Sequence, residues 1–397
     1  MAENVQLTER ALERRVKRWL ASAPFECFIQ AAPGLEDTLH RELTAAGYKP
    51  GEAAPGGVPV DLDAAGIMYC NLTLRSASRV LLRLGNFPGG SREMLFDRAR
   101  RLPWELILGM GGTYRLHLIS QSSKLQAGDE LAQVLTDAIH RHMRELGVTV
   151  KHDDESPLEI HVRLLNDHAT LSFNTSGEHL HRRGFRRYIG EAPLRETVAA
   201  AVALEAWDGH DLVVDPFCGA GTLLLELADH ASGLPPGRKR GFAFQQAAWF
   251  RPGLWREVQR QAEPTAERQV PRIMGFDLDE KVLRAAERNL QAAGHDSVQL
   301  EAGDATRLDY GALPGNRRLL VANLPYGKRL GTPEQAEKLH RSFVRRVAEG
   351  GEWDLALLTT QPRTVRRLDV IEVISEQAVS SGGLRISLLR ARTKPQS

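Results

Sequence analysis

The stretch that decides the fold is Val213-Val214-Asp215-Pro216-Phe217-Cys218-Gly219-Ala220-Gly221-Thr222. It predicts a buried strand that ends at an aspartate, passes through a turn with two glycines and enters a helix. Glycine lets the backbone pass close to a ligand, and the start of a helix offers it free N–H groups. A GxG turn alone is weak evidence, because many strand-to-helix turns contain glycine for steric reasons. The turns after the next strands must therefore decide which ligand is bound.

Two acidic turns follow further along the chain, each at the end of an apolar strand. Asp277 closes the strand predicted over residues 272–277, where its carboxylate can accept two hydrogen bonds from a ribose diol. A helix N-cap is the alternative for such an aspartate, and it fits Asp279 better. Asp304 closes the strand predicted over residues 298–302 and can receive an adenine amino group. This order of turns resembles S-adenosylmethionine-dependent methyltransferases more than nicotinamide dehydrogenases, which favour GxGxxG.

A third signal is Asn323-Leu324-Pro325-Tyr326, directly after the fourth predicted strand. Asn and Pro both favour turns, so a turn is the alternative interpretation. The tetrapeptide matches the [N/D]-[P/x]-P-[Y/F] signature of methyltransferases that act on the amino groups of bases. The Asn323 side-chain oxygen and the Leu324 carbonyl would direct the lone pair of the amine toward a sulfonium methyl, and Tyr326 would stack on the extruded base. The sequence therefore predicts N-methylation without a covalent nucleophile.

The elements around these turns predict the fold of the second half. Strands are expected over residues 212–215, 272–277, 298–302, 319–322 and 355–359, and helices over residues 222–231, 280–293 and 333–348. Strands that alternate with helices indicate a parallel, doubly wound sheet with its ligand at the carboxyl ends of the strands. We therefore predict an α/β fold with a Rossmann-like class I methyltransferase domain over residues 185–397.

Shorter α+β patterns fill the first half. An amphipathic pattern over residues 9–20 predicts a separate N-terminal helix within residues 1–20. Strands are expected over residues 25–30, 58–62, 114–120, 158–165 and 169–174, and helices over residues 35–46, 72–84 and 131–146. Residues 21–180 therefore look like small α+β modules that precede the methyltransferase domain.

Composition indicates a soluble protein with ordinary cores. Of the 397 residues, 42% are hydrophobic, and no run approaches the ~18 apolar residues of a membrane span. Cys27, Cys70 and Cys218 are too scattered for a disulfide framework or a zinc site, and we interpret them as packing residues. A net charge of +2 gives no evidence for nucleic-acid binding. We expect a cytoplasmic monomer without metal or membrane attachment.

Taken together, the motifs resemble the THUMP-domain RNA guanine-N2 methyltransferases, closest to the RlmL type that acts on 23S ribosomal RNA. Besides the turns above, the resemblance rests on Ala32-Pro33-Gly34-Leu35-Glu36, Gly56-Gly57-Val58, Arg75-Ser76-Ala77-Ser78-Arg79, NTSGEHLHRRGFR over residues 174–186, and Ala192-Pro193-Leu194-Arg195-Glu196-Thr197. It implies that residues 21–180 hold a ferredoxin-like module and a THUMP module, the latter over about residues 65–176, which recognise RNA shape. The second methyltransferase domain of some relatives is missing, which implies one methylation.

The resemblance also assigns roles to residues. Leu194, Arg195, Glu196 and Thr197 would pack over S-adenosyl-L-methionine. Its methionine part would be cradled by Asp215, Pro216, Phe217, Cys218, Gly219, Gly221 and Thr222, its ribose held by Asp277 beside Leu278, and its adenine by Asp304 beside Ala305. Leu324 departs from the commoner proline of the signature, which is tolerable because its backbone carbonyl acts.

Contacts with RNA are expected from a few basic residues. They are Lys124, Arg182, Arg183, Arg186 and Arg187. An aromatic insertion after Arg238-Lys239-Arg240 is either a base platform or a small satellite core. The leading hypothesis is guanine-N2 methylation of structured RNA, with 23S ribosomal RNA ahead of transfer RNA. The alternatives are an adenine-N6 methyltransferase and a catalytically silent RNA-binding or ribosome assembly factor.

Overall fold

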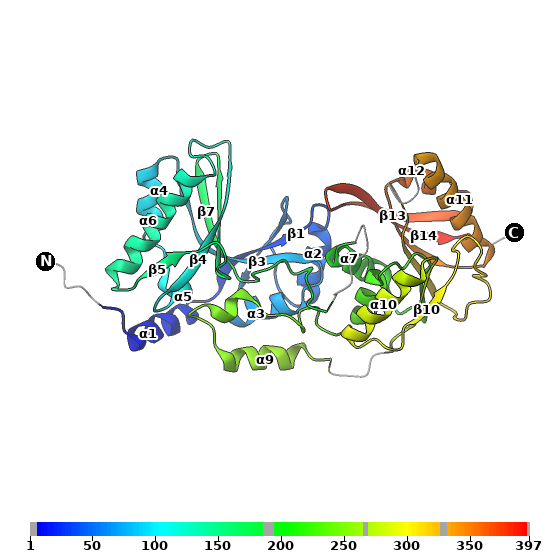
Figure 1. Ribbon diagram of the computed structural model, residues 1–397, viewed down its shortest axis with the longest axis horizontal. Helices are drawn as coiled ribbons and strands as arrows, with labels where there is room; N and C mark the ends of the chain where they lie inside the picture. The colour runs from blue at the N-terminus through cyan, green and yellow to red at the C-terminus, as the bar shows by residue number, and fades with distance from the viewer. Residues whose placement is uncertain (1–5, 186–193, 265–268, 326–331, 395–397) are drawn as a thin grey trace.

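Two seven-stranded sheets make up the computed structural model, which describes residues 6–185, 194–264, 269–325 and 332–394. Figure 1 shows the first sheet with its helices at the N-terminal end of the long axis and the second sheet at the C-terminal end. One hydrophobic core runs through both halves and includes Trp104, Leu224 and Phe244, while a second core lies on the other face of the second sheet around Val214, Leu320 and Phe343.

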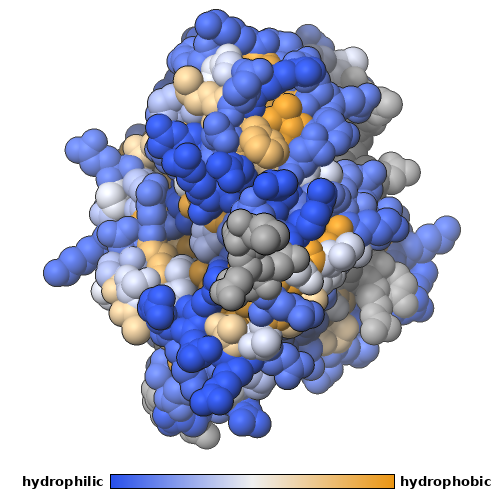
Figure 2. Space-filling view, turned by 90° about the vertical axis from the view of Figure 1, so that its left-hand side faces the viewer, coloured by the Kyte–Doolittle hydropathy of each residue, from blue (hydrophilic) through white to orange (hydrophobic). Residues whose placement is uncertain are grey.

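The first sheet has the strand order β2-β1-β3-β7-β6-β4-β5. Its strands are β1 (Phe25–Ala31), β2 (Gly57–Leu62), β3 (Ala77–Pro88), β4 (Gly112–Gln121), β5 (Val150–His152), β6 (Glu159–Leu165) and β7 (His168–Asn174). Its helices are α1 (Glu9–Leu20), α2 (Glu36–Ala45), α3 (Ala64–Thr73), α4 (Arg92–Ala99), α5 (Glu105–Leu108) and α6 (Asp129–Glu145). Because β3 pairs with both β1 and β7, the expected small modules share one continuous sheet. The α4–α6 end is mostly hydrophilic, with small separate apolar patches (Figure 2).

The predicted helix over residues 72–84 is wrong. Helix α3 ends at Thr73, and the next element is strand β3, Ala77–Pro88. Val80 and Leu82 point to one face of the sheet and Leu81 to the other, and all three are buried. A central strand that is covered on both faces has a continuous apolar run, which periodicity cannot distinguish from a buried helix.

The second sheet confirms the predicted Rossmann-like fold, with the strand order β10-β9-β8-β11-β12-β14-β13. Its strands are β8 (Leu212–Asp215), β9 (Arg272–Asp277), β10 (Gln299–Ala302), β11 (Arg318–Asn323), β12 (Asp354–Thr359), β13 (Ile371–Ser381) and β14 (Leu384–Thr393). The first five are parallel, whereas β14 runs antiparallel to both β12 and β13. No sequence pattern described above predicts this closing hairpin.

Helices cover the second sheet and reach beyond it. They are α7 (Glu196–Ala206), α8 (Thr222–Ala231), the 3-10 turn η1 (Ala243–Gln246), α9 (Pro252–Ala262), α10 (Glu280–Ala293), α11 (Pro333–Glu349) and α12 (Pro362–Arg366). Helix α9 lies against α3 of the first half, below it in Figure 1. None of the helices in the described ranges is both long and apolar enough to cross a membrane.

The rings of the aromatic insertion pack in the core that runs through both halves rather than in a separate satellite core. Phe242, Phe244 and Trp249 are almost fully buried. The backbone N–H of Phe244 donates to the carbonyl of Thr175 at 2.9 Å, and that of Trp249 donates to Leu106 at 3.2 Å. The insertion therefore attaches the second half to the first, and these three rings are not available as a base platform.

A second attachment joins the β13–β14 hairpin to the turn before α2. The Ser380 N–H donates to the Pro33 carbonyl at 2.9 Å, and the Gln377 side-chain amide donates to the Gly34 carbonyl at 2.6 Å. Gly34 has a φ of +92°, and a Cβ there would overlap the carbonyl oxygen of Ala378. Glycine is therefore required at Gly34 both by backbone conformation and by the close approach of the hairpin.

Gly34→Ala is expected to destabilise the protein more than Gly47→Ala. Both glycines have positive φ, +92° and +87°, but a Cβ at Gly47 would meet nothing within 4 Å. Both variants share the backbone strain, and Gly34→Ala adds a steric overlap worth roughly 1–3 kcal/mol. Equilibrium unfolding in denaturant measures the difference, and equal losses would show that the hairpin contact is loose.

Candidate functional site

The predicted site residues gather at one edge of the second sheet. Asp215, Asp277 and Asn323 are the last residues of the parallel strands β8, β9 and β11. Strand β8 pairs with both β9 and β11, so these three carboxyl ends are neighbours. In a doubly wound sheet, ligands bind at this edge. The structure thus brings together the three turns on which the sequence argument depends.

The glycine-rich turn folds around the first of these residues. The Phe217 N–H donates to the Asp215 carboxylate at 3.0 Å, and the Cys218 N–H donates to the Phe276 carbonyl at 3.0 Å. Gly219 and Gly221 have φ values of +54° and +82°, which side-chain-bearing residues rarely adopt. The turn therefore keeps its glycines for backbone reasons. Cys218 is a buried spacer beside it, as predicted, since its side chain is 5% exposed.

Asp277 ties this turn to the end of β9. One carboxylate oxygen accepts a hydrogen bond from the Gly219 N–H at 3.0 Å, and the other accepts from the Asp279 N–H at 3.0 Å. Asp279 itself caps α10 by accepting from Lys281 N–H at 2.8 Å, as predicted. Each Asp277 oxygen keeps a further lone pair, so the carboxylate can still accept from a ligand diol.

Asp215 is buried next to a second carboxylate. Its side chain is 1% exposed, and burial, together with the nearby charge of Asp277, raises its pKa to about 8. The hydrogen bond from Phe217 opposes this rise. Near neutral pH Asp215 therefore holds its proton, and it acts on the shape of the turn rather than as a counter-charge.

Asp215→Asn is expected to remove a pH dependence of stability. A carboxyl that keeps its proton when folded but ionises when unfolded makes the free energy of unfolding fall between the unfolded pKa of 3.8 and the folded value of about 8. The slope is at most about 1.4 kcal/mol per pH unit. Denaturant unfolding from pH 4 to pH 8 should show the wild type losing stability relative to the variant. A difference that is constant with pH would contradict a protonated Asp215.

Asp304 lies in the turn after β10, where its carboxylate already has several partners within the turn. Its Oδ1 accepts from the Thr306 N–H at 2.9 Å and from the Thr306 hydroxyl at 2.7 Å, and its Oδ2 lies 3.4 Å from Arg307 Nε. These bonds lower its pKa. Ala305 is buried, and its carbonyl accepts from the Tyr310 hydroxyl at 2.8 Å. This turn is therefore rigid, and Oδ2 is the oxygen better placed to meet an amino group.

Asn323 presents an acceptor with no partner. Its side-chain oxygen is buried and has no hydrogen-bond partner among the residues that the structure describes. The backbone on either side is fixed, because the Leu324 N–H donates to the Leu358 carbonyl at 2.9 Å and the Pro325 carbonyl accepts from His340 Nε2 at 3.0 Å. A buried acceptor without a donor costs free energy unless a ligand supplies one. Tyr326 lies outside the described residues.

His340 is a site residue that the sequence argument missed. It is fully buried on α11, and burial lowers its pKa, so the ring is neutral. Because a carbonyl can only accept, Nε2 carries the proton and donates it to Pro325. A lone histidine on an amphipathic helix gives no sequence signal for such a role.

The residues that the resemblance places over the cofactor lie just before α7 and in its first turn. Leu194, Glu196 and Thr197 are buried, while Arg195 is exposed at the N-terminal end of the helix. Helix α7 packs beside α8 and leads directly into β8, so its N-terminal end lies at the same edge as Asp215. Leu278, 74% exposed, extends from the turn after β9.

Of the five predicted RNA contacts, the structure describes three, and one of these is buried. The prediction for Arg183 is wrong, because its side chain is buried between the halves and donates to Glu226 at 3.0 Å and to the Arg75 carbonyl at 2.7 Å. Lys124 and Arg182 are exposed, and Arg182 pairs with Glu178 at 2.7 Å. Arg186 and Arg187 lie outside the described residues.

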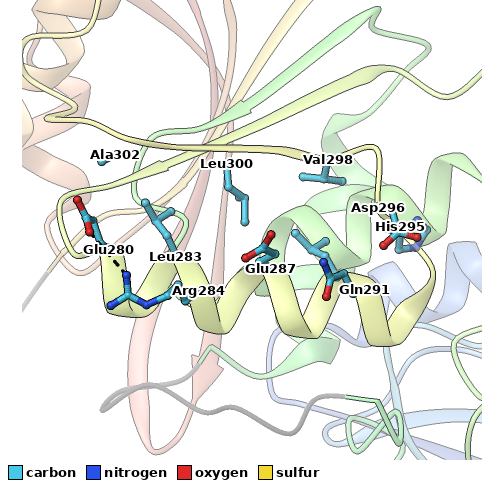
Figure 3. A pocket seen from close by; sticks show the side chains of 11 residues that line it. Glu280, Leu283, Arg284, Glu287, Gln291, His295, Asp296, Val298, Leu300 and Ala302 are labelled. Carbon is cyan, nitrogen blue, oxygen red and sulfur yellow. Dashed lines mark ion pairs between the residues drawn. The ribbon is translucent and has the colours of Figure 1, made fainter.

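A groove of about 420 Å³ lies beside this edge, between α10 and β10 (Figure 3). It is lined by apolar residues such as Leu283, Val298 and Leu300, with charged residues of α10 at its rim. Asp215, Asp277 and Asn323 do not line it, so we do not assign the chemistry to it. In the described part of the chain, no three His, Cys, Asp or Glu side chains are grouped as metal ligands.

Comparisons with known proteins agree with this geometry. The curated ribosomal RNA large subunit methyltransferase K/L of Hahella chejuensis is 34% identical over 360 residues, which is 87% of this chain and 50% of that protein. The Vibrio parahaemolyticus protein of the same name is 32% identical over 78% of this chain and 45% of its own length. The chain thus spans about half the length of these relatives. The crystal structure of SMU.472 complexed with SAH matches with a TM-score of 0.83 and 27% identity, covering 95% of this chain and 99% of that one.

Two family models match the chain. The model for RlmL ferredoxin-like domains matches residues 26–81, which hold all but the first residue of β1, together with α2, β2 and α3. The model for RMKL-like methyltransferase domains matches residues 183–386, which include every parallel strand of the second sheet. The chain therefore belongs to the family of RMKL-like methyltransferase domains, preceded here by an RlmL ferredoxin-like domain.

Proposed function

We propose that this chain is an S-adenosylmethionine-dependent RNA methyltransferase that acts on the exocyclic N2 of a guanosine in structured RNA. We place 23S ribosomal RNA ahead of transfer RNA as the substrate. The observation that carries this proposal is the buried side-chain oxygen of Asn323 at the carboxyl end of β11, which has no partner among the described residues. It is the acceptor that an amine needs, at the edge where a doubly wound sheet binds its ligand.

The chemistry follows from the amine itself. An exocyclic nitrogen conjugated to a base ring is a poor nucleophile, because its lone pair is delocalised. An acceptor at Asn323 and the Leu324 carbonyl would hold the two amine hydrogens and favour a tetrahedral nitrogen. The cofactor would supply an electrophilic methyl group on a sulfonium. His340 fixes the backbone of this turn by holding the Pro325 carbonyl at 3.0 Å, and Tyr326 would stack on the base.

The residues around the glycine-rich turn fit the cofactor. Asp277 keeps one free lone pair on each oxygen for the two ribose hydroxyls, after accepting from Gly219 and Asp279. Leu278 is apolar and 74% exposed, which suits a contact with the adenine face. Asp304 would accept from the adenine amino group through Oδ2. The turn from Asp215 to Thr222, with Leu194–Thr197 above it, would hold the methionine part.

The substrate proposal rests on the relatives and on the first half. The relatives' name states ribosomal RNA, whereas the Asn-Leu-Pro segment suits guanine N2 and adenine N6 equally. We further propose an N-terminal helix within residues 1–20, an RNA-binding region over residues 21–180 with a THUMP module at about residues 65–176, and a methyltransferase domain over residues 185–397. Lys124, Arg182, Arg186 and Arg187 remain proposed RNA contacts. We propose a cytoplasmic monomer.

The purified full chain tests the proposal in two steps. S-adenosylmethionine should raise its melting temperature, because a ligand that binds the folded state stabilises it. The chain should then transfer labelled methyl groups to unmodified 23S ribosomal RNA, and nucleoside analysis should give N2-methylguanosine. N6-methyladenosine as the product would favour the rival enzyme. Binding of RNA without any response to the cofactor would favour the silent assembly factor.

A further inference from the structure

Basic side chains from several elements meet on one face of the first sheet, where it adjoins the second half. We call this group the junction cluster. It consists of Arg79 on β3, Arg115 and His117 on β4, His161 on β6, His179 after β7, and Arg195 before α7. Strand register places Arg115 opposite Glu159 and His117 opposite His161, with the two histidine rings 4.6 Å apart. Helices α4 and α6 cover the opposite face, so this face looks toward the middle of the molecule (Figure 1).

We propose that the junction cluster binds a phosphodiester of the RNA substrate and guides that strand to the Asn323 edge of the second sheet. This inference rests on the proposed RNA methyltransferase function and extends it to a site on the first sheet. Of the cluster's residues, the sequence argument assigned a role to Arg195 alone, toward the cofactor.

The charges of the cluster do not balance. Glu159 is the carboxylate within it, and it accepts from Asn174 and Arg115, both at 2.9 Å, and from His161. These partners hold its pKa at about 2, against the opposing effect of burial. Arg79 is left with no partner for its buried Nε among the described residues, and the same holds for Nε of Arg115. The cluster therefore holds three arginines against one carboxylate, and each oxygen of Glu159 already accepts a hydrogen bond.

The neighbouring histidines respond to this excess of positive charge. Burial first, and then the charges of Arg79, His181 and Arg195, lower the pKa of His179 to about 4, while Glu159 opposes them. His181, stacked on His179 at 5.2 Å, is depressed to about 4 by burial and by Arg195. Both rings are thus neutral at pH 7 and add no charge of their own. An anion bound here would neutralise the arginines.

Arg240 holds one part of the cluster in place, the turn that carries His179. The guanidinium of Arg240 donates to the carbonyls of His179 and Arg182 at 2.6 and 3.1 Å, and to those of Ser176 and Glu178 at 3.1 and 2.8 Å. This fixes the turn that carries His179. A preorganised site loses little conformational entropy when its ligand binds. The cluster also extends toward the Asn323 edge of the second sheet. Its exposed member Arg195 lies at the N-terminal end of α7, at the same edge as the end of the strand that carries Asn323.

The test compares two arginine variants of the full chain. Arg79→Gln removes a cluster charge, whereas Arg141→Gln removes an exposed charge on α6, on the covered side, where it pairs with Glu145 at 2.8 Å. Binding to 23S ribosomal RNA is measured at several salt concentrations. We expect Arg79→Gln to weaken binding about tenfold and to reduce the slope of log affinity against log salt by about 1, the loss of one phosphate contact. Arg141→Gln should change neither.

Further variants keep the result interpretable. Arg79→Lys should keep the salt slope, because it keeps the charge, and Arg115→Gln repeats the test from β4 if Arg79→Gln does not fold. Cofactor affinity should be unchanged by the Arg79 variants. Unchanged RNA affinity and slope in Arg79→Gln and Arg115→Gln would overturn the proposal, as would tighter binding of polyglutamate than of RNA at equal salt. A wild-type chain that neither binds nor methylates RNA would instead overturn the proposed function.

Discussion

Replacing Asn323 by alanine is expected to slow methyl transfer roughly a hundred- to a thousandfold, by analogy with the loss of one oxyanion-hole donor. Its side-chain oxygen has no partner in the described structure, so removing it breaks no internal hydrogen bond. Its bond to the amine strengthens only as the nitrogen becomes tetrahedral, and the loss therefore falls on the chemical step rather than on binding.

Single-turnover methyl transfer with saturating RNA measures this effect directly. Asn323→Asp keeps an acceptor oxygen at the same position and should retain part of the rate. Asn86→Ala is the matched control, because Asn86 is exposed on β3, in the other sheet, and should leave the rate unchanged. A wild-type rate in Asn323→Ala would mean that the Asn-Leu-Pro segment is only a turn.

Asp277→Ala is expected to weaken cofactor binding about ten- to a hundredfold, corresponding to roughly 1.5–3 kcal/mol for a charge-assisted hydrogen-bonded pair. In the proposed site, the variant removes the acceptors for two ribose hydroxyls. It also frees the N–H groups of Gly219 and Asp279, which the carboxylate holds at 3.0 Å each, so the glycine-rich turn loses its link to β9.

Titration calorimetry with S-adenosylmethionine measures the loss. Asp279→Ala is the control, since Asp279 caps α10 through the Lys281 N–H at 2.8 Å. Removing this cap should cost about 1 kcal/mol of stability and leave cofactor affinity nearly intact. An affinity that Asp277→Ala leaves unchanged would remove Asp277 from the cofactor site.

The second sheet could be predicted because its signals are local. Each parallel strand is a short apolar run that ends in a polar or glycine-rich turn, and the five predicted runs match β8 to β12 closely. Parallel strands place their carboxyl ends at one edge, so Asp215, Asp277 and Asn323 could be grouped from the sequence alone. The closing hairpin of β13 and β14 lies beyond the last of these turns, and no comparable signal marks it.

Contacts between distant segments could not be predicted. Strand β3 was taken for a helix, because burial on both faces hides its alternation. Arg183 was assigned to RNA from its basic neighbours, but its partners, Glu226 and the Arg75 carbonyl, come from elements far away in the sequence. His340 likewise acts through Pro325, which a different element carries.

The same contacts change how the halves can be tested. The sequence suggests that residues 185–397 could be expressed alone to bind the cofactor. Phe242, Phe244 and Trp249 are buried in a core shared with the first half, and the Phe244 N–H donates to Thr175 at 2.9 Å. Truncation would expose these rings to solvent. The roles of the two halves are therefore better tested with point variants of the full chain.

We propose that this chain methylates the N2 of a guanosine in 23S ribosomal RNA. The most direct measurement is mass spectrometry of nucleosides and oligonucleotides from 23S ribosomal RNA of a strain that lacks the chain. We predict the loss of one N2-methylguanosine, restored by the wild-type gene and not by Asn323→Ala. An unchanged set of N2-methylguanosines, or the loss of N6-methyladenosine in its place, would contradict the account.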